Sequence, residues 1–377
     1  MNSGDSADDG DGPQASASIK KVEPMKKYLL ALAAFVGAGT VSAQSSVTIF
    51  GVVDAAYRSA TTSGVGTTNS VISGGFSSSR YGFRGQEDLG GGLSASFWLE
   101  SFLAVDTGAA TPAGFQRRST VSLSGSDWGE VRLGRDYTPT HSNWSRYDPF
   151  NYVGIGAVQL LILSATGTTP VTAAFGANPN TVQRIGNGIQ YILPRNAWGI
   201  DGGLVYAFGE GGTAANDQHN GKGARIGYAS GPILVSFAHM RTSNNLTTGD
   251  FKDTALAGSY NTGFLSVSGG VRRLQYLNSK QNNYLLAASM PLGVHELKAS
   301  WNRAVFGGSV GAVSIANDRA DQYAVGYVYN LSKRSRLYAT YAKINNKGNA
   351  RFVIQGALAG AAGARSSGFE TGINHEF

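Results

Sequence analysis

The residues of this chain that could carry out chemistry are mainly arginines. The chain has no cysteine, which excludes thiol catalysis, a disulfide framework and cysteine-ligated zinc or iron–sulfur sites. Its five histidines show no His-Glu-x-x-His spacing, and no Gly-x-Ser-x-Gly elbow occurs. Arginines can bind anions, and rings of charge at the narrow point of a channel select ions. The candidates are Arg80, Arg84, Arg117, Arg118, Arg132 and Arg184.

The composition of the 377 residues excludes several classes of protein. Only 15% of them are charged, against roughly 25% in soluble globular domains, while 52 are glycine and 10% are aromatic. Disordered chains have few aromatic residues and high charge. The longest apolar stretch, 28–38, is much shorter than the ~20 residues that a membrane-spanning helix needs. Composition therefore favours β-structure in the form of a sandwich, a solenoid or a barrel.

Residues 1–43 are not expected to belong to the fold. In the segment 25–43 (MKKYLLALAAFVGAGTVSA), two lysines, an apolar run and a small-residue end follow one another as in a secretory signal peptide. Residues 1–24 are polar and acidic, and an export signal works poorly behind such a segment. We therefore expect 1–24 to be a non-native extension, with translation starting at Met25. The mature chain, 44–377, would carry 27 basic and 19 acidic residues.

Alternation of apolar and polar residues with a period of two predicts sixteen strands in the mature chain. Most have 9–14 residues, the length that a tilted strand needs to cross a bilayer. The predicted strands are 47–58, 72–87, 93–106, 116–125, 130–137, 185–193, 200–210, 222–230, 232–243, 253–263, 264–276, 281–291, 294–306, 320–331, 335–346 and 366–377.

The connections between these strands alternate in length, and this is typical of a membrane barrel with short turns at one rim and long loops at the other. Short turns are expected at 88–92, 126–129, 194–197, 231–232, 291–293 and 332–334. Longer loops are expected at 59–71, 107–115, 138–184, 211–221, 244–252, 277–280, 307–319 and 347–365. The fold class is therefore an all-β, 16-stranded antiparallel transmembrane β-barrel. The alternative is a soluble sandwich with exposed tyrosines.

Strand parity assigns the arginines to one face. The aromatic and aliphatic residues of each strand share a parity that we place in lipid, as Tyr81 and Phe83 do in 72–87. The residues of opposite parity, which face the lumen, include Arg80, Arg84, Arg118, Arg132 and Arg184.

Four segments resemble the general porins of β-proteobacteria and Neisseria: SSVTIFGVVD at 45–54, SRYGFRGQEDLGGGL at 79–93, VRLGRDYTP at 131–139 and GINHEF at 372–377. The resemblance spans the mature chain. It implies short periplasmic turns and long extracellular loops, a homotrimer in outer-membrane lipid and lipopolysaccharide, and passive diffusion of small hydrophilic solutes without a cofactor. It also implies that Phe377 ends a signal read by the barrel assembly machinery.

The resemblance further implies that the third long loop, 138–184, folds inward and narrows the pore. The family's pattern maps a pore-lining arginine onto Arg117 rather than Arg118, which gives a cluster of Arg80, Arg117 and Arg184 with the other three arginines nearby. The apolar run 153–165 of this loop is too short to span a membrane, and we expect it to pack against the inner wall or a short helix.

The charges of the predicted constriction favour small anions as permeants. The loop contributes one acid, Asp148, together with His141 and Arg146. The alternative is that the arginines pair with acids inside the barrel and leave little net field; these acids are Glu87, Glu100, Glu130 and Asp136.

Other functions fit the sequence less well. A pore specific for phosphate or small organic acids is the nearest rival, because inward arginines serve both. An adhesin would use the Gly- and Ala-rich loops 59–71 and 347–365. An enzyme barrel would need a carboxylate–His or Ser–His pair at one rim. Nucleic acid is not an expected partner, because no basic patch is interleaved with aromatic residues.

Overall fold

The computed structural model describes residues 46–109, 114–176, 178–194, 198–209, 219–243 and 249–377. The predicted extension 1–24 and signal peptide 25–43 lie outside the described residues. Eighteen strands form one antiparallel sheet. They are β1 (Ser46–Thr62), β2 (Gly66–Ser73), β3 (Arg80–Gly90), β4 (Leu93–Phe102), β5 (Arg118–Gly125), β6 (Gly129–Tyr137), β7 (Arg184–Ile192), β8 (Ile200–Ala207), β9 (Asn220–Ser230), β10 (Ile233–Ser243), β11 (Phe251–Asn261), β12 (Ser266–Tyr276), β13 (Ser279–Leu292), β14 (His295–Val310), β15 (Val313–Ser314), β16 (Arg319–Asn330), β17 (Ser335–Lys347) and β18 (Arg365–Glu376).

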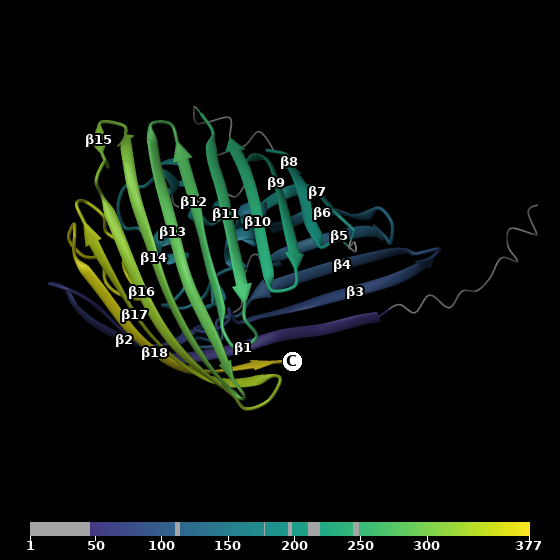
Figure 1. The fold of residues 1–377 in the computed structure, drawn as a ribbon, viewed down its shortest axis with the longest axis horizontal. Coiled ribbons are helices and arrows are strands. Elements are labelled where there is room, and N and C mark those ends of the chain that lie inside the picture. The colour runs from purple at the N-terminus through teal and green to yellow at the C-terminus, as the bar shows by residue number, and fades with distance from the viewer. Residues whose placement is uncertain (1–45, 110–113, 177, 195–197, 210–218, 244–248) are drawn as a thin grey trace, which may run out of the picture. The chain divides into compact units, whose positions relative to one another are not determined.

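The sheet closes on itself as a barrel, and the sixteen predicted spanning strands are confirmed (Figure 1). Each long strand pairs with its neighbours in the chain, and β1 completes the ring by pairing with β18 and with β3. The two additional strands lie in predicted loops. β2 extends β1 as a hairpin, and the two-residue β15 pairs with the end of β14. Closure removes the unpaired edges that lipid would not tolerate.

The connections follow the predicted alternation with one exception. Seven short turns lie at the rim that also holds the carboxyl end of the chain. They join β3 to β4, β5 to β6, β7 to β8, β9 to β10, β11 to β12, β13 to β14 and β16 to β17. The opposite rim carries the longer loops, but β12 and β13 are joined there by Leu277 and Asn278 alone. A tight turn is possible because Leu277 adopts a positive φ of 50°.

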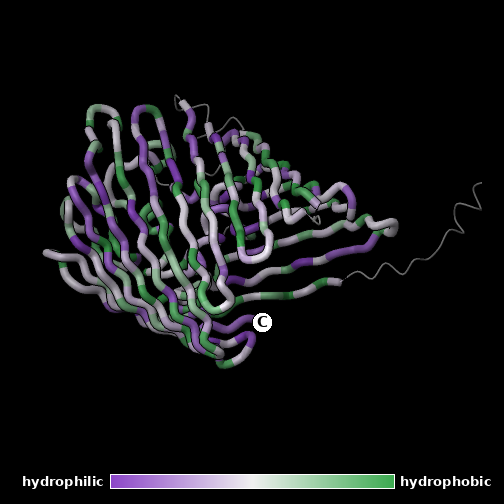
Figure 2. The backbone as a smooth tube through the Cα atoms, in the orientation of Figure 1, coloured by the Kyte–Doolittle hydropathy of each residue, from purple (hydrophilic) through white to green (hydrophobic). Residues whose placement is uncertain are grey.

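Hydrophobic and hydrophilic residues alternate along the strands (Figure 2), as a barrel in lipid requires. The outward positions hold exposed apolar residues such as Val235, Phe237 and Leu256. The terminal Phe377 is 49% exposed, and its backbone exchanges hydrogen bonds of 3.0 and 3.1 Å with Gly51. A Cβ at position 51 would overlap the Phe377 ring, so glycine there makes room for the end of the chain.

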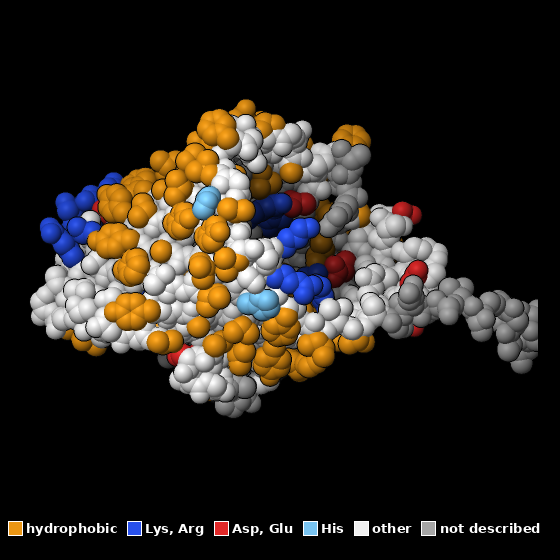
Figure 3. All heavy atoms as spheres, turned by 90° about the horizontal axis from the view of Figure 1, so that it is seen from below, with side chains coloured by type: hydrophobic (Ala, Val, Ile, Leu, Met, Phe, Trp, Pro, Cys, Tyr) orange, Lys and Arg blue, Asp and Glu red, His pale blue; other side chains and the backbone are white. Residues whose placement is uncertain are grey.

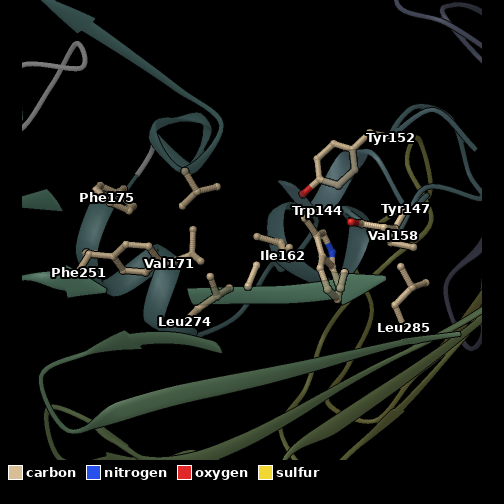
Figure 4. Packing of buried hydrophobic residues seen from close by; sticks show 14 of the residues in the cluster. Trp144, Tyr147, Tyr152, Val158, Ile162, Val171, Phe175, Phe251, Leu274 and Leu285 are labelled. Carbon is tan, nitrogen blue, oxygen red and sulfur yellow. The ribbon is translucent and has the colours of Figure 1, made fainter. Parts of the chain in front are cut away.

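The third loop fills much of the barrel interior. Between β6 and β7 the chain forms helices α2 (Pro139–Ser145), α3 (Leu160–Leu163) and α4 (Pro170–Phe175) and the 3-10 helix η1 (Pro179–Val182). Trp144, Val158, Ile162 and other loop residues pack on inward side chains of β11–β13 (Figure 4). The rest of the apolar run packs on β14, β16 and β17. The run thus packs on the inner wall, which was one of the two expected arrangements, and it also contains α3.

Small inward residues make space for this loop. The wall that receives it presents alanines where larger side chains would collide with the helices, and all of them are buried: Ala255, Ala257, Ala304, Ala320, Ala324 and Ala342. Loop and barrel therefore share two apolar cores inside the ring. Among the described residues, no helix is both long and apolar enough to cross a membrane.

Candidate functional site: the pore constriction

Helix α2 lies across one side of the interior and defines the narrow region. Thr138 caps its first turn by accepting a hydrogen bond from the backbone N–H of His141, at 3.2 Å, and Pro139 occupies the first position. Thr140 Oγ1 donates to Asp253 Oδ2 on β11 at 2.6 Å, and the buried Trp144 packs on the same wall. The helix therefore turns Ser142 and Ser145 toward the remaining open space.

That space is a cavity of about 980 Å³ between the third loop and the opposite wall. The wall side carries Arg80 at the start of β3, Arg117 just before β5 and Arg184 at the start of β7. These arginines come from the starts of three alternate strands of the ring, with β4 and β6 between them, and their side chains line the same cavity. The predicted cluster of Arg80, Arg117 and Arg184 therefore lines a single cavity.

Arg117 and Arg184 are each only 6% exposed, and neighbouring groups hold both side chains in place. Arg117 donates to Glu100 of β4 and, at 3.3 Å, to the Tyr137 hydroxyl. Arg184 donates to the same hydroxyl at 2.9 Å and to the backbone oxygen of Arg117 at 3.0 Å. Their guanidinium carbons lie over aromatic rings, Arg117 4.6 Å from the centre of Phe102 and Arg184 4.4 Å from the centre of Tyr137.

Arg80 is positioned by a segment that sequence reasoning assigned to a strand. Residues 74–79 do not continue β3 but bend into the barrel, and Arg80 donates to Ser77 Oγ at 3.0 Å and to the backbone oxygen of Ser78 at 2.9 Å. Its Nε also lies 3.5 Å from Glu100 Oε1. Glu100 is thus shared by Arg80 and Arg117, and one negative charge serves two positive ones.

Asp54 of β1 holds this bent segment and was missed by the sequence reasoning. Its fully buried carboxylate accepts hydrogen bonds from the backbone N–H groups of Gly75, Phe76 and Ser77 at 2.8–3.1 Å. It also accepts from the Tyr338 hydroxyl at 2.6 Å and from the Asn374 side chain at 2.9 Å. In the sequence Asp54 is one polar residue in an alternating strand, and no nearby motif predicts the five groups that donate hydrogen bonds to it.

The other three predicted arginines form a second group toward the short-turn rim. Arg132 donates to Glu130 Oε1 at 2.9 Å and to Asp136 Oδ2 at 2.7 Å, and Arg118 Nε lies 3.4 Å from the same Asp136 oxygen. Both line two smaller cavities, of about 230 and 370 Å³. Arg84 lines the larger of these, with its guanidinium carbon 5.3 Å from the rings of Phe50 and Trp98.

The choice between Arg117 and Arg118 does not arise, because both side chains line interior cavities. Arg118 faces inward by strand parity, as part of β5. Arg117 lies one residue before β5 begins, so parity does not fix its direction, and the ion pair with Glu100 turns it inward.

Asp148 is not found at the cavity surface, in contrast to its expected place at the constriction. It is 6% exposed, and its two oxygens accept from the backbone N–H groups of Phe150 at 2.9 Å and Val158 at 3.0 Å. Burial raises the pKa of this carboxyl to about 6. Asp148 therefore organises the third loop from within rather than placing a negative charge against the arginines.

The remaining charged groups of the loop add little to the field. His141 stacks on Tyr137, and burial beside Arg184, Arg272 and Arg117 lowers its pKa well below the usual value, so it stays neutral. Arg146 donates to Asp201 Oδ2 on β8 at 2.8 Å. In the part of the chain that the structure describes, no three His, Asp or Glu side chains gather in a metal-binding group.

Comparison with known proteins identifies the architecture. The model of the Gram-negative porin family matches residues 29–349. The chain belongs to this porin family. It is 38% identical to outer membrane porin protein 32 of Delftia acidovorans, over 94% of this chain and 100% of that one. It is 26% identical to major outer membrane protein P.IB of Neisseria meningitidis serogroup B, over 90% and 99% of the two chains.

Solved structures agree with this membership. The anion-selective porin from Comamonas acidovorans is 35% identical, with a TM-score of 0.75, and the match covers 89% of this porin and 100% of that chain. A trimer form of OmpT of Vibrio cholerae, 13% identical with a TM-score of 0.59 over 88% and 99% of the chains, shares the fold. The protein is therefore an outer-membrane channel of Gram-negative type, and its relatives are porins rather than enzymes.

Positive charge predominates along the interior of this porin. Four of the six predicted arginines, Arg80, Arg117, Arg118 and Arg132, form ion pairs with three acids, which are Glu100, Glu130 and Asp136. The fourth acid that we considered, Glu87, is exposed and forms no ion pair among the described residues. Half of the arginine charge is thus neutralised. Figure 3 shows basic and acidic side chains together in a hollow of the surface.

Proposed function

We propose that this porin is an anion-preferring diffusion pore whose selectivity comes from two groups of arginines. The first group, Arg80, Arg117 and Arg184, acts at the constriction, and the second, Arg84, Arg118 and Arg132, acts on the short-turn side. The observation that carries the proposal is the excess of arginines over acids in the three cavities, whose linings hold eight arginines and four acids. The anion-selective porin from Comamonas acidovorans supports it as a relative of the same fold.

The test is the reversal potential of the protein in a planar bilayer under a KCl gradient. We expect reversal toward the chloride potential, and a smaller shift for Arg80→Ala combined with Arg117→Ala. A matched control, Arg273→Ala with Lys280→Ala, removes two cations from exposed positions on the outer wall and is expected to leave the reversal potential unchanged. Reversal toward the potassium potential in the parent protein would refute the proposal.

A specific pore for phosphate or small organic acids is the second candidate. It is favoured by the fixed orientation of Arg117 and Arg184, whose guanidinium groups are held by Tyr137 and by aromatic rings. A guanidinium group held in a fixed orientation binds an oxyanion through two parallel hydrogen bonds, which chloride cannot accept in the same way. The measurement that separates the candidates is chloride current against added phosphate or a dicarboxylate. Saturable block indicates a specific site, and additive conductance indicates general diffusion.

We also propose the assembly that the family membership suggests. The chain is exported through residues 25–43, inserted by the barrel assembly machinery through its terminal Phe377, and assembled as a homotrimer in lipopolysaccharide-containing membrane. The trimer form of OmpT supports the trimer as a neighbour of the same fold. Mass spectrometry of the native protein tests the export signal and the trimer, because it gives the amino terminus, expected at Gln44, and the oligomer mass.

A further inference from the structure

The third loop presents a small aliphatic patch to the cavity at the constriction. The patch consists of Val153, Leu160 and Leu163. Leu160 and Leu163 are the first and last residues of α3, and residues three apart lie on the same face of a helix. The two residues between them, Leu161 and Ile162, are almost fully buried in the cores that join the loop to the barrel. One face of α3 thus packs on the barrel, and another borders the pore.

Charge and aliphatic surface lie on different sides of this cavity. The charged residues of its lining belong to the barrel wall, and they are Arg80, Arg117, Arg184, Arg336, Glu100 and Glu376. The side chains that the third loop contributes are uncharged, because they are polar amides and hydroxyls, the neutral His141 and the aliphatic patch. Since four arginines face two glutamates, the wall attracts an anion, while the loop offers it neutral surface.

The phenylalanine rings around the cavity are engaged with cations of the protein itself. The ring centre of Phe102 lies 4.6 Å from the guanidinium carbon of Arg117, and that of Phe76 lies 4.6 Å from Nζ of Lys298. Such contacts hold the cations in place. Two of the three side chains of the aliphatic patch are only partly buried. The patch therefore offers the apolar surface that a solute inside the cavity can use.

A guanidinium group on one side and aliphatic carbon on the other match a solute with a carboxylate at one end and a short alkyl chain at the other. The carboxylate accepts hydrogen bonds from the wall, and the chain leaves water against the loop. The cavity of about 980 Å³ has the size of a small-molecule site. We propose that the constriction selects short-chain aliphatic carboxylates over hydrophilic anions of equal charge. The proposal rests on the anion preference proposed above and names the class of anion that the same site takes.

The test is block of the chloride current through the full-length protein in a planar bilayer by acetate, butyrate and hexanoate at neutral pH. These anions share a carboxylate and differ in chain length alone. A methylene that leaves water completely strengthens binding about fourfold, so one that contacts the patch on a single side is expected to contribute about twofold. Hexanoate has four methylenes more than acetate and is therefore expected to reach half-block at a concentration about 16-fold lower.

Three variants test the patch through this hexanoate-to-acetate ratio. Val153→Thr with Leu163→Asn makes the patch polar without adding charge, and it is expected to reduce the ratio to about fourfold or less. Ser142→Val adds apolar surface at an exposed position of α2 on the same cavity, away from the packed cores, and is expected to raise the ratio. The matched control, Val65→Thr with Leu358→Asn, makes the same changes at exposed positions of two long loops and is expected to leave the ratio unchanged.

Three results would overturn the proposal. The first is equal half-blocking concentrations of acetate and hexanoate in the parent protein, and the second is absence of block by both. The third is a ratio that neither the polar patch variant nor Ser142→Val alters.

The reversal potential under a KCl gradient, measured for every variant, separates this proposal from the proposed function. Arg80→Ala with Arg117→Ala is expected to weaken block by acetate and by hexanoate equally and to lower the chloride preference. The patch variants are expected to change the ratio and to keep the reversal potential of the parent. A potassium-directed reversal in the parent refutes the anion-preferring pore, whereas a ratio of one with a chloride-directed reversal overturns only the selection of aliphatic carboxylates.

Discussion

Replacing Glu370 by glutamine is expected to destabilise the barrel and loosen the third loop at once. Glu370 on β18 and Arg58 on β1 lie opposite each other in the pair of strands that closes the ring. Arg58 Nε and Nη2 donate to Glu370 Oε2 at 3.0 and 2.6 Å. Glu370 Oε1 accepts from the backbone N–H of Ile155 in the third loop at 3.1 Å. The carboxylate of Glu370 thus links the β1–β18 strand pair, which is the seam of the barrel, to the third loop.

The expected magnitude follows from burial. The side chains of Arg58 and Glu370 are 2% and 1% exposed, and removing one partner of such a pair leaves an uncompensated buried charge at a cost of about 3–5 kcal/mol. An exposed pair is worth about 1 kcal/mol or less. Asp201→Asn is therefore the matched control, since Asp201 pairs with Arg146 and Arg225 but is 46% exposed.

Urea unfolding of the protein in a lipid bilayer gives the free energies. With a slope of about 3 kcal/mol per molar, the Glu370→Gln midpoint is expected to fall by about 1 M or more, and the Asp201→Asn midpoint by a few tenths. Arg58→Gln combined with Glu370→Gln is expected to recover part of the loss, because no charge then remains buried. Single-channel records of Glu370→Gln are expected to show added current noise from the third loop. Equal midpoints for Glu370→Gln and Asp201→Asn would refute the reasoning.

Three further predictions concern the loops. Because the pKa of Asp148 is raised to about 6, the folded state binds a proton more tightly than the unfolded state. The free energy of unfolding, measured with urea, is therefore expected to rise by up to about 3 kcal/mol as the pH falls from about 6 to about 4, and Asp148→Asn should abolish this pH dependence. His141→Gln is expected to leave the reversal potential between pH 5.5 and 7.5 as it is in the parent, because burial keeps His141 neutral, and an altered pH profile would contradict this. Asp54→Asn is expected to lower chloride preference with little change in the mass of the native oligomer, because losing acceptor capacity for the 75–77 backbone releases the segment that positions Arg80. A selectivity equal to that of the parent would argue against this role.

The strands were predictable from the sequence because each of them separates two different environments. Lipid outside and a packed or watery interior inside force a period of two, so 232–243 and 253–263 were assigned within a few residues of β10 and β11. The segment 74–79 was misassigned for a related reason. Its residues alternate acceptably, but the carboxylate of Asp54 offers the 75–77 backbone N–H groups a better acceptor than a neighbouring strand.

The interior of the third loop was not predictable to the same degree. Its helices have four to seven residues, too few for a 3.6-residue period to stand out. Asp148 was expected in the lumen because it is the acid of that loop, yet two backbone N–H groups of the loop decide its position. Residue type gives the chemistry of a side chain, but its direction in an irregular segment depends on backbone that sequence periodicity does not describe.

The anchors of the constriction come from the first and last strands of the barrel. Asp54 and Arg58 lie on β1 and Glu370 on β18, and through them the seam holds the bent segment 74–79, the third loop at Ile155 and the last loop at Gln355. None of the three residues has a local signal, because the groups that they bind are distant in sequence. Since the Arg58–Glu370 pair requires β1 to lie beside β18, this anchor of the third loop exists only once the barrel is closed. The constriction is therefore a consequence of closure, and a variant that opens the seam should lose the pore's selectivity before it loses its strands.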